Sequence, residues 1–390
     1  MKENQKKLND KNKEYELIIK QKEEELINKK EMQLKKGIKN VTFTIIGNSC
    51  YINAVLHCLI QTKKLTKYFL NGKDKNSNKE IDIGNKNSFY QAYLELIKTI
   101  YEEKVKKIFN LENFLVKLEN INPLFKKGES GDCKDFLIFI LNQLHKELKK
   151  ANIIKTRNIK NAYNQYDKKI VFDYFLCDFE NQLSIISDLF FGWIENTNEC
   201  CNCKTFFNSR GLDNPICYNY GIFAYLIFPL EQIEKTKNNK MKKNNIGIYD
   251  CFNFYQNNKF FTGDNKNYCN CCKKLCDSIY NSRIYISPNI LIIILERNKN
   301  NINQIKLEFY ENIDISQYIL QKEKPQIIYN LYAVITYIVI NNKAFFIASC
   351  KSSIDEKWYR YKDDKIIPIE DFLKEIIDFG TPYILFYQKV

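Results

Sequence analysis

The sequence predicts a fold of the α+β class, in which a helical first part is followed by a second part of mainly antiparallel strands. Helical patterns dominate up to about residue 150, whereas short aromatic and β-branched runs separated by turns dominate from about residue 173. No internal repeat is visible. With 45% apolar and 14% aromatic residues among 390, the chain can build a sizeable core, so disorder of the whole chain is excluded.

The first segment, residues 1–38, differs in composition from the rest of the chain. It consists almost entirely of Lys, Glu, Asn and Gln with isolated Leu and Ile. Glu and Lys lie three or four residues apart, a spacing that supports a solvated helix, but the apolar positions do not sustain the heptads of a coiled coil. We expect a charged helical or disordered extension, followed by one domain over residues 39–390.

The predicted elements of this domain begin with an extended segment and three helices. Gly47-Asn48-Ser49 has the composition of a turn and helix N-cap, and a helical run follows from Cys50 to about Lys63. Further helical patterns cover 88–103 and 132–150. The later runs predict strands, which we place at 225–228, 284–286, 290–295, 329–340, 345–348 and 383–387.

Charge, hydropathy and cysteine content narrow the classes of function. Lysine and arginine total 60 against 46 acidic residues, a formal charge of +14, but no recognition motif accompanies this charge, so nucleic-acid binding is not predicted. The longest apolar run is far shorter than the roughly 20 residues of a membrane helix. Fourteen cysteines with no apolar secretion signal at the N-terminus indicate a reducing compartment, cytoplasm or nucleus, where thiols bind metal or do chemistry.

Two CxxC pairs predict a metal centre. Cys200 and Cys203 form the first pair, and Cys269 and Cys272 form the second. A two-residue spacer lets one tight turn present two thiolates, so two such turns can complete a tetrahedral Cys₄ site for structural Zn²⁺. The neighbouring Cys201 and Cys271 leave the register of the ligands open, and the alternative is that these are ordinary buried cysteines.

Cys50 is the candidate nucleophile. A thiol at a helix N-terminus feels the positive end of the helix dipole, which favours the thiolate, and the backbone N–H groups there can hold an oxyanion. Taken alone, such a cysteine is more often a small core residue.

Neighbouring motifs favour the interpretation of Cys50 as a nucleophile over that of a core residue. Residues 47–53, GNSCYIN, resemble the cysteine box of the ubiquitin-specific proteases, and residues 130–137, SGDCKDFL, are similar to the second box of that family. The segment that leads into Cys200, the SPNILIIILER stretch at 287–297 and the closing PYILFY at 382–387 also match, in the family's order. The resemblance covers about residues 40–388.

The resemblance implies a papain-like fold with a helical thumb, an antiparallel β palm and zinc-bearing fingers inserted at about 190–285. It implies a thiol-dependent deubiquitinase with Cys50 as nucleophile, and ubiquitin or a ubiquitinated protein as partner.

Three positions of the family's catalytic machinery are altered here. Phe345 occupies the place of the catalytic histidine, Lys362 that of its acidic partner, and Ile45 that of the oxyanion asparagine. The chain has only two histidines. His57 lies two helical turns beyond Cys50 and His145 falls in a structural helix of the family, so neither is expected to serve as the base.

We therefore expect a catalytically degenerate member that binds ubiquitin. One alternative is an active cysteine deubiquitinase that hydrolyses the isopeptide bond with a substitute base, for which Tyr337 and Asp363 are poor candidates. The other is a structural scaffold in a nuclear or RNA-processing assembly, where inactive relatives of this family occur.

Overall fold

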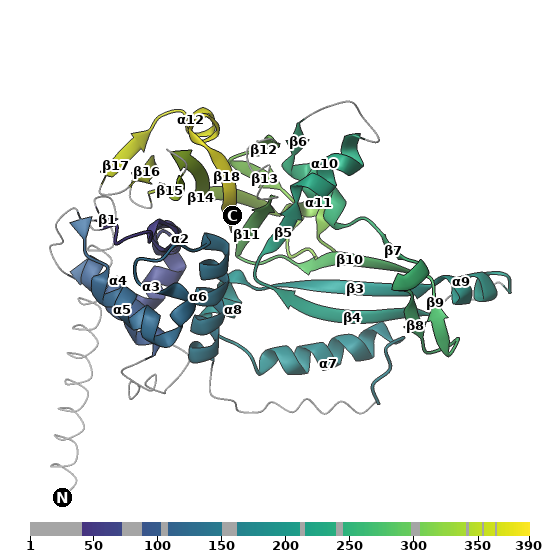
Figure 1. The fold of residues 1–390 in the computed structure, drawn as a ribbon. Coiled ribbons are helices and arrows are strands. Elements are labelled where there is room, and N and C mark those ends of the chain that lie inside the picture. The colour runs from purple at the N-terminus through teal and green to yellow at the C-terminus, as the bar shows by residue number, and fades with distance from the viewer. Residues whose placement is uncertain are drawn as a thin grey trace, which may run out of the picture.

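A computed structural model of the chain describes residues 41–71, 88–102, 108–149, 162–210, 215–238, 245–297, 305–340, 343–352, 355–362 and 365–390. The predicted extension at 1–38 lies outside these residues. Figure 1 shows a group of helices at the N-terminal end of the fold, a large sheet beside it, and a long arm of strands that extends away from both. No helix in these ranges is long and apolar enough to cross a membrane.

The helical group is the thumb, and its core helix is α2. This helix is almost entirely buried, because the other thumb helices pack on one side of it and the large sheet packs on the other. Strand β1 (Thr42–Phe43) leads into it and pairs in parallel with β2 (Ile108–Phe109). The thumb helices are α2 (Cys50–Ile60), α3 (Lys63–Asn71), α4 (Phe89–Glu102), α5 (Glu112–Ile121), α6 (Cys133–Leu148) and α8 (Ile185–Phe190).

The large sheet is the palm, with strand order β17-β16-β15-β14-β18-β11-β5 and β13 paired to β14. Every pair in it is antiparallel except that of β11 with β5. The strands are β5 (Leu226–Pro229), β11 (Ile290–Glu296), β13 (Asn312–Asp314), β14 (Ile328–Ile340), β15 (Lys343–Lys351), β16 (Trp358–Lys362), β17 (Lys365–Ile369) and β18 (Thr381–Lys389).

Both faces of the palm sheet are covered, which explains its continuous apolar strands. On β11, Ile290, Ile292 and Ile294 belong to the core shared with the thumb. The alternate side chains of the same strand enter a second core on the opposite face. That second core also contains residues of α10 (Leu230–Asn238), α11 (Ile248–Tyr255), α12 (Phe372–Phe379), β6 (Ile246–Gly247) and β12 (Leu307–Glu308).

The arm forms the fingers, a four-stranded sheet in the order β4-β3-β10-β7. Helix α7 (Lys168–Glu180) lies along it (Figure 1) and packs phenylalanine rings on Trp193 and Tyr220 of the sheet. At the far end lie α9 (Cys201–Asn208) and the hairpin of β8 (Asn267–Cys269) and β9 (Lys274–Cys276). The four strands are β3 (Gly192–Cys200), β4 (Ile216–Phe223), β7 (Lys259–Phe261) and β10 (Ser278–Ile286).

The predicted α+β class and hand-like architecture are confirmed, with two corrections. The helix expected over 50–63 ends at Ile60, and a second helix begins at Lys63. The part after residue 173 is less purely β than predicted, because α7 continues to Glu180 and short helices cap the second core. These short helices have six to nine residues each, too few for a helical period to stand out.

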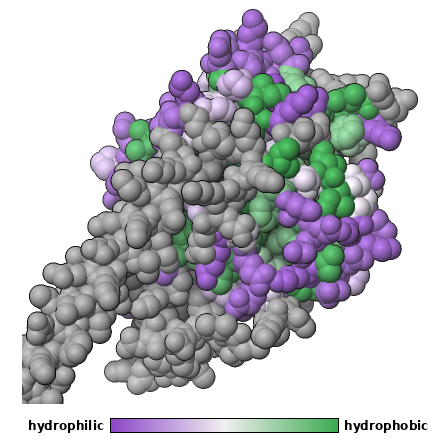
Figure 2. Space-filling view, turned by 90° about the vertical axis from the view of Figure 1, so that its left-hand side faces the viewer, coloured by the Kyte–Doolittle hydropathy of each residue, from purple (hydrophilic) through white to green (hydrophobic). Residues whose placement is uncertain are grey.

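Figure 2 views the thumb side of the molecule. Hydrophilic residues dominate the coloured part of this face, and smaller hydrophobic groups lie between them. This is the pattern expected of a surface that faces water.

Candidate thiol site and metal centre

The start of α2 is held by a close approach of two glycines. Gly47 adopts a left-handed φ of 60° and forms a bridge with Gly128. A Cβ on Gly47 would lie 2.5 Å from the Gly128 Cα, so this contact requires glycine. The Ser49 hydroxyl accepts a hydrogen bond of 3.1 Å from the Ile46 amide. Cys50, the first residue of α2, is thereby set at a defined place beside the palm.

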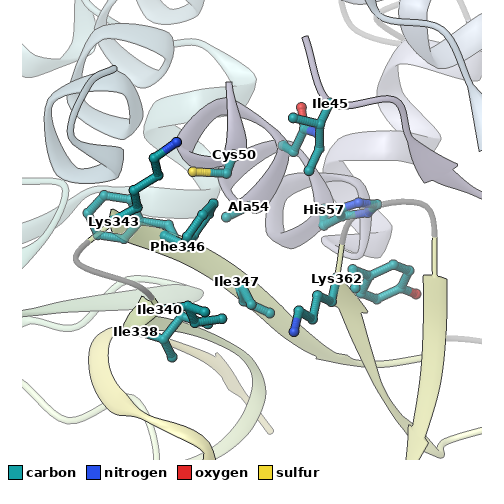
Figure 3. Close-up of a pocket in the computed structure, with 13 residues that line it drawn as sticks. Ile45, Cys50, Ala54, His57, Ile338, Ile340, Lys343, Phe346, Ile347 and Lys362 are labelled. Carbon is teal, nitrogen blue, oxygen red and sulfur yellow. The ribbon is translucent and has the colours of Figure 1, made fainter. Parts of the chain in front are cut away.

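Cys50 opens onto a cavity of about 320 Å³ between α2 and the hairpin of β14 and β15 (Figure 3). Its walls combine apolar side chains with polar ones in about equal surface. The lining residues are Ile45, Cys50, Asn53, Ala54, His57, Ile338, Ile340, Lys343, Phe345, Phe346, Ile347, Tyr361 and Lys362.

His57 lines the same cavity but is built into its wall as a packed ring. Its imidazole is stacked between the rings of Phe43 and Tyr361, with centroid distances of 4.3 and 4.2 Å. Burial lowers the pKa of His57 to about 3. Ala54 lies between it and Cys50 along α2 (Figure 3), and seven residues of helix correspond to a rise of roughly 10 Å. A neutral ring fixed in this way is a weak base, so the expectation that His57 does not activate the thiol has a structural reason.

The depressed pKa of His57 predicts acid sensitivity. The unfolded chain takes up a proton near pH 6.5 that the folded chain refuses until about pH 3, so stability falls as the pH drops through this window, by about 2 kcal/mol at pH 5. We expect His57→Phe, which keeps an aromatic ring in the stack, to remove this contribution to the pH dependence of the unfolding free energy. Urea unfolding at pH 7 and pH 5 measures it, and an equal loss of stability in wild type and variant would contradict the assignment.

His145 lies elsewhere, in α6. Its Nδ1 is 2.7 Å from the Ser184 hydroxyl, and its ring packs against Phe191. Burial, assisted by the charge of Lys149, lowers its pKa to about 4. His145 is not among the residues that line the Cys50 cavity. It links α6 to the segment that begins α8, which is a structural task.

The strand register places the two altered partner positions together. Ala348 of β15 is paired with Tyr361 of β16. Because side chains alternate along a strand, Phe345 shares a face with Lys362 and is its diagonal neighbour. Both line the Cys50 cavity. A base and its orienting acid would have to sit at such a diagonal pair, and here the pair consists of a hydrocarbon ring and a cation.

The other candidate side chains supply neither the missing base nor the missing oxyanion donor. Tyr337 packs its ring on Phe346, 5.5 Å between centroids, and does not line the cavity. Asp363 lies outside the residues that the structure describes. Ile45 is 40% exposed at the cavity rim, where its side chain offers no hydrogen bond to an oxyanion. Asn53 is also on the wall, but its amide nitrogen donates to the Thr44 carbonyl at 3.3 Å.

Lys343 and Lys362 are the charged side chains on the wall of this cavity, and the described part of the chain contributes no carboxylate to it. Lys362 was expected only at the place of the family's acidic residue, and Lys343 was not predicted to lie at the site. Lys343 stands at the start of β15, directly after the hairpin turn, and sequence spacing alone carried no signal that it would face the thiol.

The four predicted metal ligands meet at the tip of the fingers. The sulfur atoms of Cys200, Cys203, Cys269 and Cys272 all lie within 4.8 Å of one another, with separations of 3.9, 3.6 and 3.3 Å for three of the pairs. Tetrahedral coordination with Zn–S bonds of about 2.3 Å requires sulfur atoms about 3.8 Å apart. The Cys272 amide also donates to the Cys269 sulfur at 3.4 Å, which favours a thiolate. The residues present therefore fit a Cys₄ metal site.

The geometry separates these four thiols from their neighbours. Cys271 is exposed, and its thiol contacts the Tyr166 hydroxyl at 3.2 Å. Cys201 is the first residue of α9 and is not in the group. Cys276, which the sequence argument did not consider, is 2% exposed and packs in the same cluster as Cys200 and Cys203. Its position at the end of β9, the strand that completes the second knuckle, brings this fifth thiol close.

A thiol at the start of a helix beside an antiparallel palm, with a Cys₄ group on an inserted arm, is the arrangement of a papain-like fold. The model of the family "Ubiquitin carboxyl-terminal hydrolase" matches residues 41–387, so the chain belongs to this family, as a ubiquitin-specific protease-like domain.

Curated relatives agree with this assignment. The chain is 26% identical over 379 residues to ubiquitin carboxyl-terminal hydrolase 4 of Saccharomyces cerevisiae, a match that covers 88% of this chain and 39% of the relative. It is 23% identical to human ubiquitin carboxyl-terminal hydrolase 2, over 93% of this chain and 56% of the relative. The chain thus spans less than two thirds of the length of these relatives.

The fold is shared with solved structures. A chain of the SAGA Ubp8/Sgf11/Sus1/Sgf73 DUB module bound to ubiquitin aldehyde aligns with a TM-score of 0.62 at 18% identity, over 90% of this chain and 69% of that one. A structure of a similar module bound to monoubiquitin gives the same TM-score. At this identity the likeness concerns the fold.

Proposed function

We propose that this domain is a catalytically degenerate ubiquitin-specific protease that binds ubiquitin or a ubiquitinated partner without cleaving it. The observation that carries the proposal is the composition of the Cys50 cavity. A thiol protease needs a base that accepts the thiol proton and later protonates the leaving amine. The one histidine on this wall is stacked with a pKa of about 3, and a phenylalanine stands at the diagonal of Lys362.

The magnitudes favour loss of turnover over slow turnover. A positioned general base contributes roughly 10²- to 10⁴-fold in rate, and loss of a triad member can cost roughly 10⁶-fold. The lysines can stabilise a Cys50 thiolate. A lysine cannot serve as the acceptor in the first step while it remains protonated, so the thiolate alone does not restore the cycle.

Ubiquitin binding is supported by the family and by the preserved hand. The thumb, palm and fingers are all present, and related structures carry ubiquitin aldehyde or monoubiquitin. We further propose that Cys200, Cys203, Cys269 and Cys272 hold a structural Zn²⁺. The ion would cross-link two short turns. Its role would be structural, because four thiolate ligands leave no open coordination position for catalysis.

Two measurements test the proposal together. Isothermal titration with ubiquitin measures binding, and release of a fluorophore from a C-terminal ubiquitin amide measures turnover, with Cys50→Ala as the matched control and an active relative as the reference. We expect binding, with a rate equal to that of Cys50→Ala. Turnover that disappears in Cys50→Ala would replace the proposal by the active deubiquitinase. Absence of binding by folded, zinc-loaded protein would leave the structural scaffold.

A further inference from the structure

The Cys50 cavity has a one-sided charge that the proposed function does not yet use. Lys343 and Lys362 line it from two different strands, and the described residues contribute no carboxylate to its wall. Helix α2 points its N-terminus at the same place and carries no acidic residue in its first turn, so the helix dipole adds positive potential. A catalytic centre built around a base and an acid would balance its charges, whereas the charged side chains that the described residues bring to this cavity are both positive.

The described part of the chain does not neutralise either lysine. Within the described ranges neither forms an ion pair. The ammonium of Lys362 lies 5.9 Å from the centre of the Phe379 ring, a contact that holds the chain without cancelling its charge. In Figure 3 the Lys343 side chain extends toward the Cys50 thiol, and Lys362 lies on the other side of the cavity.

The apolar part of the wall strengthens this field. Ile338, Ile340 and Phe345 line the same cavity as the two lysines, and hydrocarbon walls reduce the screening of a charge by water. An anion that enters is therefore attracted more strongly than it would be at an open surface. A neutral amide can accept a hydrogen bond from a lysine, but it forms no ion pair with it.

The C-terminus of ubiquitin is an anion in only one of its two chemical states. Released ubiquitin ends in a carboxylate, whereas conjugated ubiquitin ends in a neutral isopeptide amide that also carries the bulk of its target. We propose that the Cys50 cavity is a binding site for the free C-terminal carboxylate of ubiquitin. This inference rests on the proposed function, and it makes the domain a reader of released ubiquitin.

The two lysines are expected to contribute unequally. Lys343 extends toward the thiol, where the carboxylate would stand, so it acts as the direct ion-pair partner. Lys362 acts mainly through the field. Partly exposed ion pairs are weak, and charge-assisted hydrogen bonds in a half-enclosed site are stronger. We expect about a threefold to tenfold loss of affinity in Lys343→Gln and about a twofold to threefold loss in Lys362→Gln.

The test compares two ligands on four proteins. Ubiquitin with its native C-terminal carboxylate and ubiquitin with that carboxylate converted to a primary amide are titrated into wild type, Lys343→Gln, Lys343→Gln/Lys362→Gln, and the control Lys374→Gln. Lys374 is an exposed lysine of α12 that does not line the cavity. Titrations at low and high salt separate ion pairing from other contacts.

The expected result is about tenfold tighter binding of the carboxylate form by wild type and Lys374→Gln, with the preference lost in the double variant and reduced by salt. The amide form should bind all four proteins alike. Equal binding of both forms by wild type, or a preference that survives in the double variant, would overturn the inference and leave the proposed function standing. Failure to bind either form would overturn the proposed function itself.

Discussion

A variant with Cys203→Ser and Cys276→Ser is expected to lose its zinc and to unfold the tip of the fingers. Cys203 is 3% exposed and lies 3.3 and 3.6 Å from two of its partner thiols, so its loss breaks the tetrahedron. Cys276 is removed as well because it is the nearest thiol that can substitute. Structural zinc contributes roughly 10–16 kcal/mol of folding free energy in small fingers. The tip has little other core, since β8 and β9 have three residues each.

Metal analysis by mass spectrometry and hydrogen exchange measure the two parts of this prediction. We expect zinc to fall from about one ion per chain to none, with fast exchange confined to α9 and the hairpin of β8 and β9. The palm, which has its own two cores, should keep its protection. Cys271→Ser is the matched control, because that thiol is exposed and outside the group. Zinc retained in the double variant, or lost from Cys271→Ser, would contradict the assignment of ligands.

If the domain is degenerate as proposed, the combination of Phe345→His, Lys362→Asp and Ile45→Asn is expected to create deubiquitinase activity. The register of β15 and β16 puts the new histidine and aspartate at diagonal positions on the wall that contains Cys50. A correctly placed base is worth roughly 10²- to 10⁴-fold in rate, and we expect a gain in that range on a fluorogenic ubiquitin amide. The rate should rise with pH through about 6.5, where an imidazole becomes neutral.

Two further variants make this prediction specific. Adding Cys50→Ala must abolish the gained activity, because the thiol is the nucleophile. Replacing Phe345→His by Ala344→His moves the new base one residue along β15, to an exposed position that does not line the cavity. That register control should stay inactive. A folded triple variant without Cys50-dependent turnover would show that the cavity is altered in more than these three positions.

The architecture was predictable because each local pattern agreed with its neighbours. The turn at Gly47, the helix from Cys50, the paired CxxC turns and the long apolar strands near 290 and 335 each carry a period or composition that survives without tertiary contacts. Their order along the chain then made the resemblance to a family specific. The helices that begin after residue 173 were missed because they are only six to nine residues long, too short for a helical period to stand out.

The candidate site was predictable only in part. The four cysteines of the fingers are recognisable by their spacing and Cys50 by the motif around it, and the absence of any histidine after His145 is visible directly. The position of Lys343 beside the thiol could not be predicted from the sequence, because it depends on how the hairpin of β14 and β15 is oriented relative to α2. Cys276 was likewise hidden, because a lone cysteine has no partner at a characteristic spacing.

Residue identity along the chain was enough to predict the family and to show that no histidine follows His145, because the identity of a side chain decides whether it can carry a proton. The tertiary structure decided the rest. The state of His57 depends on two rings from segments about 300 residues apart. The positive cavity exists only because two strands and a helix terminus converge on one thiol. Electrostatic potential and pKa depend on distance and burial in space, and neither can be read along the chain.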